Sequence, residues 1–114
     1  MKTLIELNLK DNEKKALLEL KERILKKFPD AEIILYGSKA RGDYDEESDI
    51  DVLVLLDREV NTTLEDEIFH ISYETGLQYD VVFGIIVENK DFWKSSLAQA
   101  MPLHWNIDKE GLTI

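Results

Sequence analysis

The sequence predicts an α/β domain in which helices flank a small sheet of three to four strands. Its 114 residues are the length of one ordinary domain, so we expect residues 1–114 to form a single unit without a separate substrate domain. Hydrophobic residues make up 44% of the chain and charged residues 33%, which is a globular composition. Segments with helical apolar spacing alternate with short β-branched runs, an order typical of an α/β sandwich.

The first half of the chain predicts one long helix and two strands. Apolar residues recur at three- and four-residue spacing over residues 12–28, and Pro29 ends the run. The isoleucine-rich segment 31–36 is bounded by turn residues, which favours a strand. Residues 38–42 could form one helical turn. Residues 49–56 are almost entirely apolar, the pattern of a central strand covered on both faces.

The second half predicts two further helices and a third strand. A helix capped by Thr62 or Thr63 is expected to run to about residue 75 and to stop at Gly76. Turn residues and apolar patterning then predict the last three elements: a strand over residues 79–87 that is interrupted by Gly84, a helix over 91–100 that Pro102 ends, and an irregular or edge segment over 103–114.

The composition excludes several classes of function. There are no cysteines, so disulfides, thiolate zinc sites and cysteine nucleophiles are ruled out. The formal net charge of −10 would repel a phosphate backbone, so we do not expect nucleic acid as a partner. No apolar run approaches the roughly 18 to 20 residues that span a bilayer, and no secretory segment follows Met1. We therefore expect a cytoplasmic protein without a membrane partner.

Gly37 and Ser38 follow the predicted strand 31–36 directly. Glycine at the end of a buried strand lets the backbone turn sharply and lets a ligand approach the main chain. The turn after it would present backbone N–H groups and the Ser38 hydroxyl, which suits the phosphates of a nucleotide. The same strand-glycine-serine turn also occurs in proteins without a ligand, and the sequence excludes a P-loop because the Gly-Lys-Ser/Thr motif and its spacer are absent.

Asp49 and Asp51 lie two positions apart at the start of the predicted central strand, so their side chains share one face of the sheet. At the usual strand rise their carbons are roughly 6 to 7 Å apart. Two ionised carboxylates at that separation repel by about 2.5 kcal/mol at an effective dielectric of 20. A bound cation would offset this repulsion. The alternative is that Asp49 is an exposed strand start and Asp51 accepts local backbone hydrogen bonds.

Asp80 begins the third apolar run and would stand beside the first two acids if that strand neighbours the central one. Ligation by oxygen alone favours Mg²⁺ or Mn²⁺ over zinc. The acidic segment 43–47 suggests calcium, but an EF-hand register fails because Ser48 and Val54 replace the required glycine and glutamate. We interpret that segment as a solvated loop.

Taken together, these motifs resemble a known signature. Tyr-Gly-Ser-Lys-Ala-Arg-Gly at residues 36–42 and Asp-Ile-Asp at 49–51 resemble the Gly-Ser, ten residues, Asp-X-Asp pattern of the polymerase-β-type nucleotidyltransferase superfamily. The spacing fits, since residues 39–48 number ten. The short length and the ending Pro102–Gly111 resemble the minimal nucleotidyltransferase (MNT) subgroup, whose members are commonly paired as antitoxins with small helical HEPN toxins. The implied fold is the nucleotidyltransferase fold with a mixed sheet.

The resemblance assigns roles to six residues. It implies that Gly37 and Ser38 hold the triphosphate of ATP and that Arg41 lies near the phosphates; a surface ion pair with the acidic loop is the alternative for Arg41. It further implies that Mg²⁺, expected as two ions with Mn²⁺ as the alternative, is held by three carboxylates that serve as catalytic residues: Asp49, Asp51 and Asp80. Asp80 has no spacing motif of its own, and in the family its counterpart also activates the acceptor hydroxyl.

The implied reaction is transfer of AMP from ATP to a hydroxyl, with tyrosine expected, of a cognate HEPN protein that is thereby neutralised. Larger relatives add a domain that binds the acceptor; we expect no such domain within these 114 residues, and therefore expect the acceptor to be a separate macromolecule. Two alternatives stay open: an antitoxin that neutralises its partner by contact alone, and a nucleotidyltransferase for small molecules such as aminoglycosides. A homo- or hetero-oligomer is compatible with all three.

Overall fold

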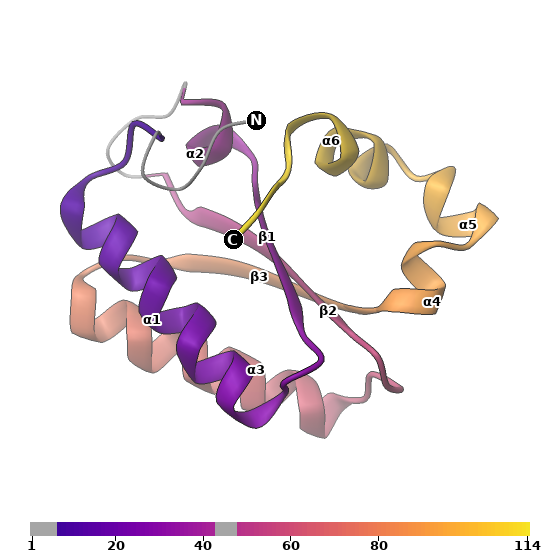
Figure 1. Ribbon diagram of the computed structural model, residues 1–114, viewed down its shortest axis with the longest axis horizontal. Helices are drawn as coiled ribbons and strands as arrows, with labels where there is room; N and C mark the ends of the chain where they lie inside the picture. Colours follow the sequence, from indigo (N-terminus) through magenta and orange to yellow (C-terminus); the bar gives the residue numbers. More distant parts are fainter. Residues whose placement is uncertain (1–6, 43–47) are drawn as a thin grey trace.

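A computed structural model describes residues 7–42 and 48–114 of the protein (Figure 1). The acidic segment 43–47, predicted to be a solvated loop, lies outside the described residues. The elements follow the chain in this order: α1 (Asp11–Lys27), β1 (Glu32–Tyr36), α2 (Ser38–Arg41), β2 (Ile50–Leu56), α3 (Thr62–Tyr79), β3 (Phe83–Asn89), α4 (Lys90–Trp93), α5 (Ser96–Gln99), α6 (Pro102–Glu110) and β4 (Leu112–Thr113).

The four strands form one mixed sheet in the order β3-β2-β1-β4. β2 and β3 run parallel, whereas β1 is antiparallel to both β2 and β4. β2 is central, and six of its seven residues are buried because helices cover both faces of the sheet. The predicted mixed sheet with a buried central strand is therefore confirmed.

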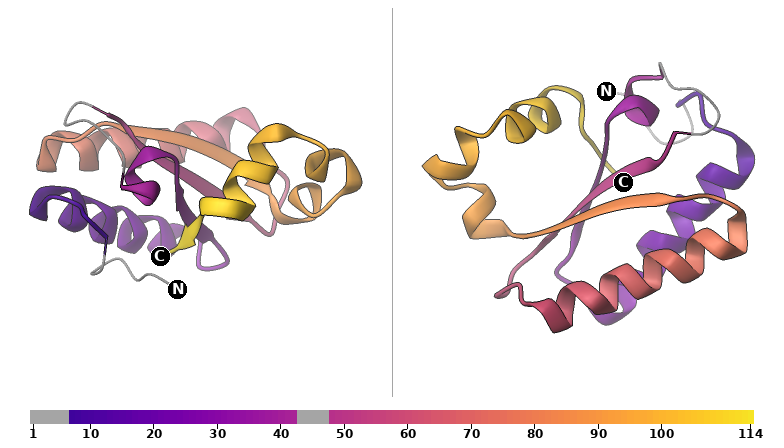
Figure 2. Two further views of the ribbon diagram at one scale, coloured as in Figure 1. Left: turned by 90° about the horizontal axis from the view of Figure 1, so that it is seen from above. Right: turned by 180° about the vertical axis from the view of Figure 1, so that it is seen from behind.

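Alternation along β2 divides the core into two layers. Val52 and Val54 pack with the side chains of α1 and α3, which lie side by side against one face of the sheet (Figures 1 and 2). Leu53 and Leu55 pack on the other face with Trp93 of α4 and Ile107 of α6. Asp51 has the same parity as Leu53, so its side chain lies on the face that α4, α5 and α6 cover.

The prediction that α3 stops at Gly76 is wrong. α3 continues to Tyr79, and Asp80 then adopts a left-handed conformation with φ of 58°. A Cβ atom on Gly76 would lie 2.5 Å from the carbonyl oxygen of Val81, so glycine here permits the chain to fold back tightly against the helix. The Val81 N–H donates to the Gly76 carbonyl at 3.0 Å. The chain turns back over residues 80–82, so β3 begins at Phe83 and not at the predicted position 79.

The end of the chain is more regular than its sequence indicates. The predicted helix over 91–100 is two short helices, since the Ser95 side chain accepts a hydrogen bond from the Ala98 N–H and starts α5 anew. Pro102 does not end a helix but begins α6. Proline is tolerated there because the N–H group that it lacks has no hydrogen-bond partner within the first turn of a helix. The prediction of an irregular or edge segment over residues 103–114 is wrong for residues 103–110, which belong to α6; only Leu112–Thr113 form an edge strand, β4, which pairs with β1. None of the described helices is long and apolar enough to cross a membrane.

Candidate functional site

The chain turns sharply at the end of β1 and forms a compact loop over Gly37–Gly42. Gly37 has φ of +78° and Gly42 has φ of +84°, values that L side chains rarely adopt, so both ends of the loop favour glycine. The Gly37 carbonyl accepts from the N–H groups of Ala40 and Arg41, at 3.1 Å each, which closes the single turn α2. The turn predicted from the sequence is therefore present, and it brings Arg41 back toward the end of the sheet.

The Asp51 carboxylate lies between two glycines, Gly37 directly after β1 and Gly84 within β3. Asp51 is the register partner of Tyr36 on β1 and of Gly84 on β3. A Cβ atom on Gly37 would lie 2.4 Å from Asp51 Oδ2, and one on Gly84 would lie 2.9 Å from Asp51 Oδ1. The space that holds this half-buried carboxylate thus exists because neither neighbour carries a side chain.

Around Asp51 there are more negatively charged side chains than positively charged ones. Burial raises the pKa of Asp51 above its usual value, and the neighbouring negative charges of Asp49 and Glu110 raise it further, while Arg41 opposes the shift. Burial and the charge of Asp51 likewise raise the pKa of the Tyr36 hydroxyl. A carboxylate such as that of Asp51, whose charged form is disfavoured by burial and by neighbouring negative charge, is one that a divalent cation would stabilise.

Glu110, the last residue of α6, contacts the loop Gly37–Gly42 through both oxygens of its carboxylate. Its Oε1 accepts from the Gly37 N–H at 3.2 Å, and its Oε2 pairs with Arg41 Nη1 at 2.9 Å. Neither Glu110 nor Gly84 was assigned a site role from the sequence. For Gly84 a usable signal exists, since glycine inside a strand often marks a close approach. For Glu110 the signal is absent, because its contact with Gly37 joins residues 73 positions apart.

Lys39 belongs to the signature motif but is anchored in the core. Its ammonium group pairs with Glu13 of α1, and the two side chains are 0% and 6% exposed. The other oxygen of Glu13 accepts from the Lys10 N–H at 2.9 Å at the start of α1. This buried pair fastens the loop Gly37–Gly42 to α1 and so fixes the position of Ser38 beside it.

Asp49 and Asp80 lie at the same end of the sheet, since β2 and β3 both begin there. Asp49 is exposed and directly precedes β2. Asp80 is also exposed, and it lines a cavity of about 330 Å³ together with Ser48 and Ile50. Within residues 7–42 and 48–114, no three His, Cys, Asp or Glu side chains are grouped so that they could hold a metal ion. The structure thus brings Asp49 and Asp51 close enough to interact, and the metal-binding roles of Asp49, Asp51 and Asp80 stay predictions.

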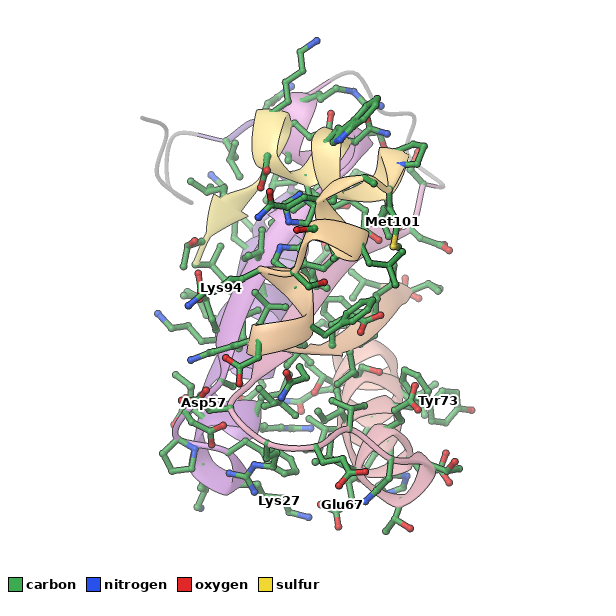
Figure 3. All side chains as sticks on the ribbon, turned by 90° about the vertical axis from the view of Figure 1, so that its right-hand side faces the viewer. Lys27, Asp57, Glu67, Tyr73, Lys94 and Met101 are labelled. Atoms are coloured by element: carbon green, nitrogen blue, oxygen red, sulfur yellow. The ribbon has the colours of Figure 1, made fainter. Side chains whose placement is uncertain are left out.

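A second cavity, of about 430 Å³, lies between α3 and β3. Its described lining is apolar or uncharged and includes Phe69, Tyr73 and Val82. Tyr73 extends outward from α3 in Figure 3 and is 66% exposed. Because charged groups are lacking among the described residues that line it, this cavity does not suit a phosphate or a metal ion.

Comparisons with known proteins agree with this geometry. The model of a nucleotidyltransferase domain family matches residues 17–104. A "putative protein adenylyltransferase" of Methanocaldococcus jannaschii is 35% identical over 102 residues, which cover 88% of this chain and 95% of that protein. The crystal structure of a toxin-antitoxin with AMP-PNP has a TM-score of 0.61 at 16% identity, covering 91% of this chain and 72% of that one. A crystal structure titled "putative nucleotidyltransferase" has a TM-score of 0.52 at 36% identity, covering 72% and 87%.

The chain therefore belongs to the nucleotidyltransferase domain family, and it is a nucleotidyltransferase. Its nucleotidyltransferase fold and the resemblance drawn from residues 36–42 and 49–51 are both confirmed.

Replacing Gly84 by alanine is expected to lower nucleotidyl transfer with little change in folding. The added methyl group would lie 2.9 Å from Asp51 Oδ1 and must push that carboxylate aside by a few tenths of an ångström. Because small misplacements of reacting groups are costly, we expect transfer to fall at least about tenfold. Initial rates and thermal unfolding of Gly84→Ala are measured beside Ile86→Val, a change on the same face of the same strand. Equal rates for wild type and Gly84→Ala would show that the Asp51 position is not critical.

Proposed function

We propose that this protein transfers AMP from ATP to a hydroxyl group, with tyrosine expected, of a cognate HEPN toxin, and that it thereby acts as the antitoxin. The observation that carries the proposal is the Asp51 carboxylate, held between Gly37 and Gly84 beside the loop that contains Ser38 and Arg41. The relative named as a putative protein adenylyltransferase supports this reaction, and the similar toxin-antitoxin crystallised with AMP-PNP supports ATP as the substrate and a toxin as the partner.

In the proposed complex, the Gly37 N–H, the Ser38 hydroxyl and the Arg41 guanidinium bind the phosphates of ATP. Backbone N–H groups and a guanidinium are charge-complementary to phosphate oxygens, and arginine can bind two of them at once. Arg41 is 45% exposed at its side chain, so a ligand can reach it. The adenine and ribose have no assigned contacts.

The proposed reaction is an in-line displacement at the α-phosphate. The acceptor hydroxyl oxygen forms a bond to the α-phosphorus, the bond from that phosphorus to the bridging oxygen breaks, and pyrophosphate leaves. The hydroxyl proton passes to a nearby carboxylate, and Asp80 is the proposed acceptor. Arg41 stabilises the charge that develops on the leaving pyrophosphate.

The donor set suits Mg²⁺ or Mn²⁺, because Asp49 and Asp51 are oxygen ligands whose mutual repulsion a cation would relieve. We propose that these two residues, with Asp80, hold the metal. When bound, the ions would neutralise phosphate charge and increase the acidity of the acceptor hydroxyl.

The direct test incubates the protein with labelled ATP, Mg²⁺ and the product of the adjacent reading frame. We expect label on a tyrosine of that partner and no label when EDTA replaces Mg²⁺. We also expect the partner to lose its toxicity, and this loss to require ATP. The readouts are gel autoradiography and mass spectrometry of the modified peptide.

Other results of this experiment would contradict the proposal in defined ways. Stable association with the partner and full neutralisation without label would instead indicate an antitoxin that acts by contact. Label found only on an added aminoglycoside would indicate a small-molecule nucleotidyltransferase. The same assay is then repeated with an excess of partner variants that lack a tyrosine. It distinguishes loss of the acceptor tyrosine from loss of enzyme activity.

A further inference from the structure

Glu110 places both of its carboxylate oxygens on donors of the loop Gly37–Gly42. The distances are 3.2 Å from Oε1 to the Gly37 nitrogen and 2.9 Å from Oε2 to Arg41 Nη1. The Glu110 side chain is only 16% exposed, whereas that of Arg41 is 45% exposed. The Glu110 carboxylate is thus largely enclosed at the loop, while the Arg41 side chain reaches the surface.

The main chain on both sides of Glu110 is held firmly. Glu110 ends α6, whose Ile107 is buried against the sheet. Immediately after it, Leu112 of β4 pairs with Leu35 of β1, one residue before the strand reaches Tyr36. The same strand that leads into the loop therefore positions the carboxylate that contacts it.

These two donors are the ones that the proposed function gives to the phosphates of ATP. A carboxylate and a phosphate are both anionic acceptors, and both form short charge-assisted hydrogen bonds with N–H donors and guanidinium groups. Gly37 has a single backbone N–H, so Glu110 and a phosphate oxygen cannot both use it fully. The negative charge of Glu110 also acts on the neighbouring Asp51 carboxylate, so it would repel an incoming phosphate.

We propose that Glu110 occupies the place of a nucleotide phosphate in the free protein, and that the nucleotide must displace it from Gly37 and Arg41. This inference rests on the proposed function, because it takes the loop as the phosphate site. Glu110 then competes with the nucleotide for the two donors and so lowers the affinity of the free protein for nucleotide. It takes no part in bond making or breaking.

The test measures binding of AMP-PNP with Mg²⁺ to the full chain by calorimetry. Glu110→Gln keeps the size and one acceptor oxygen but removes the charge, and we expect it to bind AMP-PNP about tenfold more tightly than wild type. Asp108→Asn is the matched control, since it removes one negative charge from the same helix and Asp108 pairs instead with His104. We expect its affinity to stay within about twofold of wild type.

A kinetic readout separates this role from a general structural one. For Glu110→Gln we expect the KM for ATP to fall by a similar factor while kcat stays within about threefold of wild type, since removing a competitor for the loop strengthens binding equally in the ground state and the transition state. Glu110→Asp provides a second variant in case Glu110→Gln folds poorly, because it keeps the charge and withdraws it by one methylene group. It should bind AMP-PNP about threefold more tightly than wild type.

Unchanged or weaker binding of AMP-PNP by both variants would overturn the inference. Loss of kcat at unchanged affinity would also overturn it, because Glu110 would then act in the chemical step. A wild-type protein that binds no AMP-PNP with Mg²⁺ would overturn the proposed function as well, and this result is distinguishable because it appears before any variant is made.

Discussion

Asp51→Asn is expected to abolish nucleotidyl transfer while the protein remains folded. The half-buried carboxylate of Asp51 lies between Gly37 and Gly84, at positions where an added Cβ atom would meet its two oxygens. Under the proposed function it holds the metal in both the ground state and the transition state. We expect the rate to fall at least about a thousandfold, which corresponds to roughly 4 kcal/mol of lost transition-state stabilisation.

The rate is measured at saturating Mg²⁺ and ATP, with Asp57→Asn as the control. Asp57 follows β2 at its other end and is exposed, so the control makes the same charge change far from the loop. Wild-type transfer by Asp51→Asn under these conditions would remove the basis of the metal assignment. Near-zero transfer by both variants would point instead to a general effect of charge.

The same variant should be at least as stable as wild type when metal is absent. The pKa of Asp51 is raised in the folded protein, above its ordinary value of 3.8, mainly by burial. A raised carboxylate pKa means that the stabilising contribution is present below the unfolded pKa and is lost as pH rises through the folded pKa. At neutral pH the ionised side chain therefore weakens the metal-free fold, and asparagine relieves this. Thermal unfolding in EDTA at pH 7 checks the sign.

Glu13→Gln is expected to destabilise the protein more than any other single change described above. Glutamine has nearly the same size as glutamate but carries no charge, so the fully buried ammonium of Lys39 loses the carboxylate of Glu13. Breaking one half of a buried ion pair costs about 3 to 5 kcal/mol, a large share of the roughly 5 to 15 kcal/mol that stabilises a typical domain. Denaturant unfolding followed by circular dichroism measures the loss.

Glu19→Gln on the same helix is the matched control for this experiment. Glu19 pairs with Arg23 four residues later, and both side chains are partly exposed, so the expected loss is below about 1 kcal/mol. The double variant Glu13→Leu with Lys39→Met should recover much of the stability, because apolar residues can replace a buried pair. Equal losses for Glu13→Gln and Glu19→Gln would show that burial does not determine the strength of the Lys39 pair.

Local sequence patterns predicted the parts of the fold that local forces determine. Apolar periodicity placed α1, β1 and β2 within one or two residues of their bounds, and the position of Asp51 on a buried strand followed from alternation. The end of α3 was missed because Gly76 reads as a helix stop, whereas here it makes room for the returning chain at Val81.

The candidate site was only partly predictable for a related reason. Gly37 and Ser38 were predicted from a short motif whose members are close in sequence. Gly84 and Glu110 join the site through strand register and through a contact across the whole chain, which single-sequence patterns do not encode. Asp80 was expected beside the other acids because its segment reads as strand, and the longer α3 places it before the strand begins.

The residues around Asp51 come from four separate stretches of the chain, and the bond between Glu110 and Gly37 spans 73 positions. Contacts of such wide separation are completed only when the entire sheet has assembled. Under the proposed function, a partly folded chain would therefore lack the phosphate site, and ATP would bind only the fully folded protein. Such binding would add to the free energy of global unfolding, so nucleotide would stabilise the whole domain and not one part of it.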